Sequence, residues 1–163
     1  MAKETVFKKF NGEKIKNFEE YVKNVLEKNP GTEIIVGTDS QNRGSRTYYS
    51  TVIAMCYKDE AGQGHGAHCI YSKWYIMRDK SSTKLPFERL TNEVVVSIQV
   101  ADALTLAGID VTCIDIDINP DPQFESNKIY AALKGMVVGS GYECRWKTLG
   151  PLITTMADYV VKH

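Results

Sequence analysis

Acidic side chains stand where strongly apolar runs end, and carboxylates in that position can bind cations. Asp39 closes the segment IIVGTD, whose apolar start suits a buried strand. In CIDIDIN, strand alternation places Asp115, Asp117 and Asn119 on one face and the isoleucines on the other. Carboxylates on a covered sheet face destabilise a fold unless cations or hydrogen-bond donors compensate their charge. Metal binding is therefore one prediction. The alternative is that these acids cap strand ends or accept hydrogen bonds from loop N–H groups.

The elements that position these acids follow from the periodicity of the apolar residues. Helical spacing predicts helices in NFEEYVKNVLEKNPG, in residues 87–107, in SNKIYAALKGMVVGSG and in LITTMADYVVK. Runs of β-branched and aromatic residues predict strands in EIIVGTD, RTYYSTVIAMCYKD, HCIYSKWYIMRD, IDVTCIDIDI and YECRWK. The glycine-rich segment DEAGQGHGAH predicts a hairpin tip, so His65 and His68 are interpreted as tip residues rather than metal ligands.

The order of these elements predicts an α/β fold. We expect a five-stranded mixed sheet, β-β-β-α-β-α-β-α, with helices on both faces and an extra N-terminal helix. One domain spans residues 1–163 in this prediction, with 1–31 as a helical extension and 32–163 as the core. Right-handed crossovers return the fourth strand beside the first and parallel to it. Ligands of such sheets bind beyond the carboxyl ends of parallel strands. Asp39 and Asp117 occupy two such ends, which favours a shared site.

Composition narrows the class of protein. Lys plus Arg and Asp plus Glu each number 20, and this zero net charge argues against a strong, sequence-independent grip on nucleic acid or anionic membranes. A local basic face remains compatible with it. No apolar run approaches the roughly 20 residues that span a bilayer, and MAKETVFKKF has no signal-peptide core, so we expect a cytoplasmic protein without a membrane partner. The scattered cysteines are interpreted as small buried strand residues.

The pattern resembles the ribonuclease H-like superfamily, and within it a small bacterial branch of predicted nucleases, the YkuK type. The segments that carry the resemblance lie within about residues 33–163: IIVGTDSQ, LPFERLTNEVVVSIQVADAL, IDIDIN followed by SNKI, and GYECRWK followed by MADYV. In that superfamily, a first-strand Asp, a helix Glu, a fourth-strand Asp and an acid of the last helix bind two divalent ions. The resemblance implies that Asp39, Glu93, Asp117 and Asp158 hold these positions here.

Each implied residue also has a plainer structural interpretation. Glu93 adjoins the apolar stripe of its helix, which favours a site role over a solvated one, and Glu88 is the lesser candidate. Asp158 is otherwise a surface acid of the last helix. Further residues are candidates for substrate contact or for support of the ligands, with turn formation or a surface lysine as the alternatives: Ser40, Gln41, Asp115 and Lys147.

The resemblance implies two-metal hydrolysis of nucleic-acid phosphodiester bonds. Asp39 would bridge both ions, with Asp117 and Glu93 on one ion and Asp158 on the other. Oxygen donors without His or Cys favour two Mg²⁺ or Mn²⁺ ions over zinc. Two alternatives stay open, because fold alone does not fix function. One is a non-catalytic nucleic-acid or protein-binding module of the same fold, and the other is a nucleotide phosphatase.

The type of nucleic acid stays open between RNA, DNA and a hybrid of the two. Hybrid-cleaving relatives often carry a loop histidine before the last helix and a basic insertion, and KTLGPL has no histidine. No basic insertion is present either. Some positive charge surrounds the expected hairpin and the connector that follows it, from Arg43, Arg46, Lys73, Arg78, Lys80 and Lys84.

Overall fold

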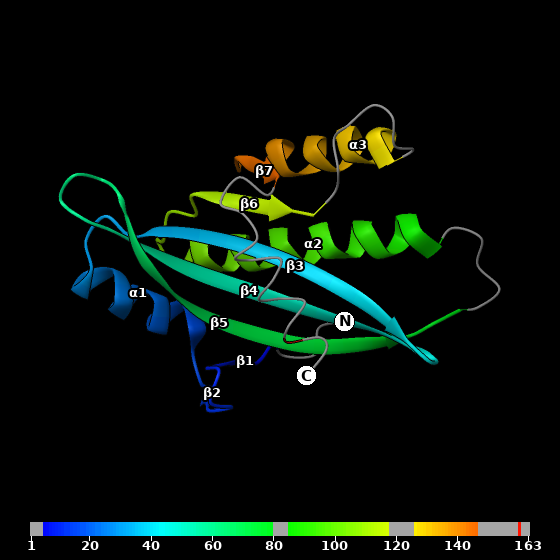
Figure 1. Ribbon diagram of the computed structural model, residues 1–163, viewed down its shortest axis with the longest axis horizontal. Coiled ribbons are helices and arrows are strands. Elements are labelled where there is room, and N and C mark those ends of the chain that lie inside the picture. The colour runs from blue at the N-terminus through cyan, green and yellow to red at the C-terminus, as the bar shows by residue number, and fades with distance from the viewer. Residues whose placement is uncertain (1–4, 80–84, 118–125, 147–159, 161–163) are drawn as a thin grey trace.

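The computed structural model describes residues 5–79, 85–117, 126–146 and 160 (Figure 1). Its helices are α1 (Phe18–Lys28), α2 (Leu85–Leu106) and α3 (Ser126–Gly139). Its strands are β1 (Phe7–Lys8), β2 (Lys14–Ile15), β3 (Glu33–Arg43), β4 (Arg46–Lys58), β5 (Gly64–Met77), β6 (Cys113–Ile116) and β7 (Cys144–Trp146). The helix expected in LITTMADYVVK falls, except for Val160, outside the described residues.

The strands form one seven-stranded mixed sheet in the order β2-β1-β5-β4-β3-β6-β7. The prediction of five strands was wrong, because β1 and β2 are also present. Each has only two residues, too few for alternation to reveal a strand in the sequence. Lys8 of β1 pairs with Tyr71 of β5, so the N-terminal segment extends one edge of the sheet.

Strands β3, β4 and β5 form a long antiparallel meander. Gly44, with φ of 57°, lies in the first turn, and Gly62, with φ of 77°, lies in the second. Such positive φ values suit glycine because it has no Cβ. The second turn is shorter than the sequence suggested, since β5 already begins at Gly64. His65 and His68 therefore lie in a strand rather than in the tip, and His68 Nε2 is 2.6 Å from the Tyr21 hydroxyl of α1.

The predicted parallel return is confirmed. β6 pairs in parallel with β3, with Ile35 opposite Cys113 and Gly37 opposite Asp115, and β7 pairs in parallel with β6. The backbone N–H of Ile34 donates to Thr112 Oγ1 at 3.0 Å, which fixes the start of this pairing. The crossover through α2 thus places the ends of β3 and β6 together.

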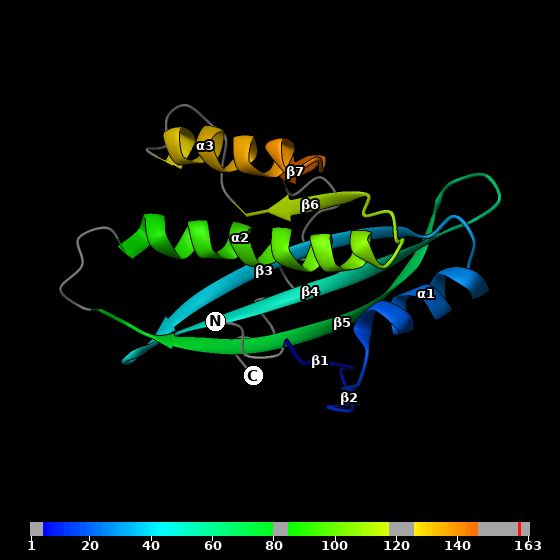
Figure 2. The ribbon, with the colours of Figure 1, turned by 180° about the vertical axis from the view of Figure 1, so that it is seen from behind.

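The pleat of the sheet sorts the core into two clusters. The larger one lies between the sheet and the helices and joins Ile34 and Val36 of β3 to side chains of α1, α2 and α3 (Figure 2). The smaller one, on the opposite face, contains Ile35, Val52, Ala54, Cys69 and Cys113. All three described helices therefore pack on one face. The prediction of helices on both faces stays a prediction, because nearly all of the last expected helix lies outside the described residues. None of the described helices is long and apolar enough to cross a membrane.

The cysteines behave as the sequence indicated. Cys69 and Cys113 are buried, Cys56 and Cys144 are half-buried, and all are free thiols. Burial raises the pKa of Cys69 to about 11 and that of Cys113 to about 12. Protonated thiols are poor nucleophiles and poor metal ligands, so these side chains act as packing groups.

Candidate functional site

Asp39 and Asp117 meet at the carboxyl ends of two parallel strands. The last paired residues of β3 and β6 are Gly37 and Asp115. Continuing this register by two residues on each strand brings Asp39 level with Asp117, which directly follows the end of β6. Asp39 lies on the same face of β3 as Ile35 and Gly37, and if the alternation of β6 continued by one residue it would place Asp117 on that face too. Both acids are half-buried. The structure thus brings these two predicted residues together.

Helix α2 adds a third acid to this end of the sheet. Glu93 is only 5% exposed, and the Ser40 hydroxyl donates a short hydrogen bond to its Oε1. The pKa of Glu93 is raised to about 8, chiefly by burial and also by the negative charges of Asp39 and Asp117. The Ser40 hydrogen bond and the charge of Arg89 oppose that rise. The three acids are therefore coupled electrostatically, with Asp39 acting on Glu93 more strongly than Asp117.

Polar contacts join α2 to β3 and to β4 on the two sides of Glu93. The Thr38 and Ser97 hydroxyl oxygens are 2.8 Å apart, and Asn92 Nδ2 donates to the Tyr49 hydroxyl at 3.2 Å. Sequence analysis did not anticipate these contacts. Two signals were available: Thr38 and Ser40 share the helix-facing parity of β3, and Ser97 follows Glu93 by one helical turn. These contacts fix the position of α2 over the sheet, and with it the position of Glu93.

Asp115 precedes Asp117 by two residues and lies on the face of the sheet opposite the helices. It is 3% exposed, and its register partner on β7 is Arg145. Its neighbours Ile114 and Ile116 belong to the helix-facing core, as the alternation predicted. Asp115 is thus buried within the sheet, two residues before Asp117.

The remaining sequence candidates divide between described and undescribed parts of the chain. Gln41 lies two residues beyond Asp39 on the same face and accepts a hydrogen bond from Arg43 Nε at 3.3 Å. Glu88 is exposed, which supports Glu93 as the helix acid. Asp158 and Lys147 lie outside the described residues. Their roles stay predictions.

The described acids have the ligand chemistry for a divalent cation, although they do not form a complete coordination site. Within residues 5–79, 85–117 and 126–146, no three His, Cys, Asp or Glu side chains are arranged to hold a metal ion. All of the candidate donors are carboxylate oxygens, which Mg²⁺ and Mn²⁺ prefer. The raised pKa of Glu93 means that its charged form lacks compensation, and a cation would provide it. The Ser40 hydroxyl donates to that carboxyl group.

A comparison with protein families decides where the chain belongs. The family model described as Ribonuclease H-like matches residues 13–162. The chain belongs to the ribonuclease H-like family. Neither a comparison with curated proteins nor one with solved structures gives a match. The family match begins before α1, at residue 13, whereas the segments that carry the resemblance in sequence begin at about residue 33. The match therefore includes α1.

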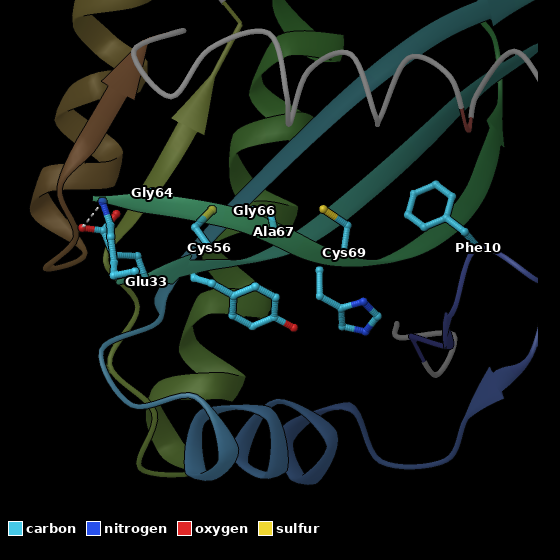
Figure 3. A pocket seen from close by; sticks show the side chains of 10 residues that line it. Phe10, Glu33, Cys56, Gly64, Gly66, Ala67 and Cys69 are labelled. Atoms are coloured by element: carbon cyan, nitrogen blue, oxygen red, sulfur yellow. Dashed lines mark ion pairs between the residues drawn. The ribbon is translucent and has the colours of Figure 1, made fainter. Parts of the chain in front are cut away.

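A cavity of 540 Å³ in this ribonuclease H-like chain lies away from the acids (Figure 3). It is lined mainly by apolar groups, including Phe10, Cys56, Ala67 and Cys69, at the end of the sheet where β3 begins. Asp39, Glu93 and Asp117 are not among its lining residues. The strand-end acids therefore mark the better candidate for chemistry, since the charged groups that line the cavity, Glu33 and Lys58, already pair with each other.

Proposed function

We propose that this ribonuclease H-like chain is a metal-dependent nuclease that hydrolyses phosphodiester bonds of nucleic acid. The observation that supports it most is the meeting of three acids, with Asp39 level with Asp117 and both acting on buried Glu93. Two bound Mg²⁺ or Mn²⁺ ions would supply positive charge to activate a water and to stabilise the leaving 3′ oxygen. Family membership supports a nuclease over the many other functions of α/β folds.

The chain's own residues would hold and orient the ions. Asp39 would be a ligand of both ions, the role that membership of the ribonuclease H-like family implies for the acid of this strand. Glu93 and Asp117 complete one ion's ligands, and Asp158 is the proposed ligand of the other. Ser40 is a positioning residue, since its hydroxyl holds the Glu93 carboxyl against β3. Ion binding would require the Glu93 proton to leave, which couples affinity to pH.

The test is cleavage of labelled RNA, DNA and RNA–DNA hybrid by the purified protein with Mn²⁺, with and without EDTA. We expect cleavage that EDTA stops and that Asp39→Asn and Asp117→Asn each reduce by about 100-fold or more, because each removes a ligand carboxylate. Asp110→Asn, an exposed acid after α2, is the matched control and should retain activity. Full activity in EDTA, or in both strand-end variants, would contradict the proposal.

One observation favours a second candidate, a nucleic-acid-binding module without catalysis. The described acids form no three-ligand metal cluster within the ranges given above, and Ser40 occupies one oxygen of Glu93. Binding of the same nucleic acids without cleavage under Mg²⁺ or Mn²⁺ would favour this module. Release of phosphate from nucleoside triphosphates, without cleavage of polymers, would assign a nucleotide phosphatase instead.

A further inference from the structure

The sheet face opposite the described helices carries a surface beside Asp39 that the proposed chemistry does not use. Cross-strand register aligns Asp39 with Ser50 of β4 and Lys73 of β5 in one row. The next two rows on this face are Gln41, Tyr48 and Tyr75, and then Arg43, Arg46 and Met77. Ser50 is fully buried, so the exposed surface begins at Lys73, on the far side of Ser50 from the acid. Because successive rows on one face are about 7 Å apart, it runs about 14 Å from there toward the first hairpin turn.

Two tyrosine rings form the centre of this surface, which we call the tyrosine platform (Tyr48 and Tyr75 with Arg43, Arg46 and Lys73). The ring centroids of Tyr48 and Tyr75 are 5.6 Å apart, and Tyr75 is 44% exposed. The Arg46 guanidinium lies over the Tyr75 ring at 4.3 Å from its centroid. The Lys73 ammonium lies 5.3 Å from the Tyr48 centroid. Cations thus stand beside each accessible ring.

The basic side chains of the platform have no acidic partner in the described part of the chain. Arg43, Arg46 and Lys73 are exposed and take part in none of the ion pairs among the described residues. Arg43 and Arg46 instead donate to neutral oxygens, of Gln41 at 3.3 Å and of Tyr48 at 3.4 Å. Their positive charges are therefore available to an anionic ligand.

The opposite face of the same strands carries an aromatic pair with a purely structural role. Tyr49 and Trp74 stack at 4.2 Å with an interplanar angle of 6°, and Tyr49 is buried beneath α2. Cross-strand aromatic pairs of this kind commonly stabilise sheets. The platform differs because its rings are accessible and carry cations at their faces. That combination fits a ligand with both flat rings and negative charges.

We propose that the tyrosine platform binds single-stranded nucleic acid, with bases stacking on Tyr48 and Tyr75 and phosphates contacting Arg43, Arg46 and Lys73. Only unpaired bases can present their faces to a protein ring, so the platform selects single strands over duplexes. The inference rests on the proposed function, because it names the substrate class of the same site. Lys73, at the end of the platform, lies in the same cross-strand row as Asp39, with buried Ser50 of β4 between them.

Stacking is strong enough to displace the cations that now flank the rings. An exposed cation–π contact corresponds to about a two- to fivefold preference, whereas stacking of one base on an aromatic ring corresponds to about 5- to 150-fold in affinity. Displaced Arg46 and Lys73 side chains remain within reach of the phosphates of the same strand. The ring faces and the charges therefore serve one ligand together.

The test is binding in EDTA, measured by fluorescence anisotropy with labelled oligo-dT and oligo-U of about 12 nucleotides and with a duplex of equal length. We expect tighter binding of the single strands. Tyr48→Leu and Tyr75→Leu should each weaken it by about 5- to 150-fold. Tyr57→Leu, near the opposite end of β4, is the matched control and should stay within about twofold of wild type.

Salt dependence separates the charges from the rings. Three phosphate contacts on a single strand give a slope of log K against log[salt] of about −2, and the double variant Arg43→Gln/Arg46→Gln, which removes two of them, should reduce it to about −0.7. Lys23→Gln, an exposed lysine of α1, should leave the slope unchanged. Circular dichroism and melting temperatures confirm that each variant is folded before its affinity is compared.

The outcomes separate this inference from the nuclease proposal. Equal or tighter binding of the duplex, or wild-type affinity in both tyrosine variants, would overturn the platform. Mn²⁺-dependent cleavage that the platform variants leave unchanged would also overturn it, while the nuclease proposal stands. Platform-dependent binding of single strands without cleavage under any divalent ion would support the platform and remove the nuclease.

Discussion

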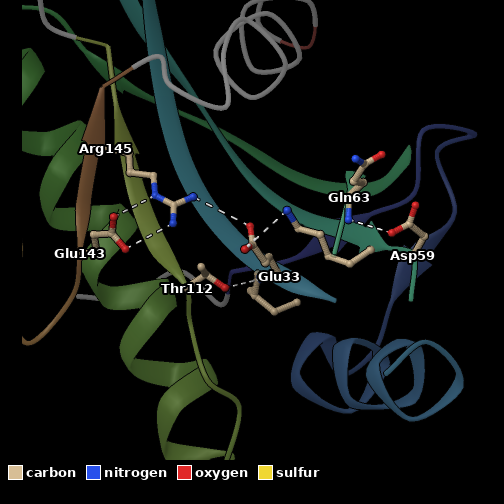
Figure 4. Close-up of polar contacts among 8 residues, drawn as sticks. Glu33, Asp59, Gln63, Thr112, Glu143 and Arg145 are labelled. Atoms are coloured by element: carbon tan, nitrogen blue, oxygen red, sulfur yellow. Dashed lines mark hydrogen bonds and ion pairs between the residues drawn. The ribbon is translucent and has the colours of Figure 1, made fainter. Parts of the chain in front are cut away.

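Acidic side chains at the two ends of β3 lie in opposite electrostatic environments. At its start, Glu33 lies between two cations, with Lys58 Nζ at 3.7 Å and an Arg145 terminal nitrogen at 3.9 Å (Figure 4). Arg145 also pairs with Glu143 at 3.1 Å. At the carboxyl end, Glu93 is held by the neutral hydroxyl of Ser40, and its pKa is raised to about 8 chiefly by burial.

This difference separates a structural acid from one held at a cost to stability. The Glu33 carboxylate is partly exposed and compensated, so its charge is easily accommodated. Glu93 is buried beside two other acids, and its charged form is disfavoured. A fold that retains such a group usually has a ligand for it. The comparison therefore predicts that substitutions at the two ends have effects of opposite sign.

The largest expected effect is on the pH dependence of metal-free stability. Because the folded-state pKa of Glu93, about 8, exceeds its ordinary value of 4.5, the folded state binds this proton more tightly. That stabilisation is complete below about pH 4.5 and is lost as pH rises through about 8, a loss of roughly 3 kcal/mol between pH 5 and pH 8. Urea unfolding in EDTA should show it in the wild type relative to Glu93→Gln.

The matched control is Glu33→Gln at the other end of β3. Its pH profile of unfolding free energy should follow that of the wild type between pH 5 and pH 8, since it leaves Glu93 in place. Identical profiles for Glu93→Gln and the wild type would mean that the Glu93 proton is not bound more tightly in the folded state, and the contrast between the two ends would fail.

A smaller effect is expected from the cation itself. Mn²⁺ at ten times its dissociation constant stabilises the protein that binds it by about 1.4 kcal/mol, a rise in melting temperature of roughly 3–5 °C for a chain of this size. Asp39→Asn should remove most of that rise, and should melt higher than the wild type in EDTA because it relieves repulsion. Glu33→Gln should keep the full rise.

The opposite result at Asp39 is equally informative. If Asp39 served only to accept hydrogen bonds, such as the one from the Ser40 N–H at 2.8 Å, the Asn variant would melt lower in EDTA. A lower melting temperature together with an unchanged Mn²⁺ response would assign Asp39 a purely structural role.

The smallest effect is expected at the compensated end. Glu33 and Arg145 are partly exposed, and ion pairs of that kind contribute about 0.2–1 kcal/mol. A double-mutant cycle with Glu33→Gln and Arg145→Gln, followed by urea unfolding, should return a coupling within that range. A coupling above about 2 kcal/mol would be typical of a buried ion pair. It would weaken the contrast between the two ends of β3.

Sequence reasoning located the acids better than it located their contacts. The convergence of Asp39 and Asp117 was predictable, because right-handed crossovers and parallel register follow from the order of elements. The Ser40–Glu93 hydrogen bond was not, since it joins side chains 53 residues apart through helix packing. The roles of Asp158 and Lys147 stay predictions, as they lie outside the described residues.

The same limit explains the errors in the sheet. The two-residue strands β1 and β2 show no periodicity, and only their pairing with each other and with β5 defines them. At the second turn of the meander, several glycines could have formed the tip. The choice depended on cross-strand register, including the irregularity between Cys56 and Lys58, which a single segment of sequence does not encode.

The pairing of β3 with β6 also sets the order in which the protein assembles. The meander closes through short turns, whereas the Ile34–Thr112 bond joins positions 78 residues apart. Because long loops close slowly and at an entropic cost, the meander is expected to form first and the parallel pair late. Asp39 and Asp117 are therefore expected to become neighbours late in folding. A cation bound between them would slow unfolding and leave the folding rate nearly unchanged. The ion would thus increase the kinetic stability of the folded protein.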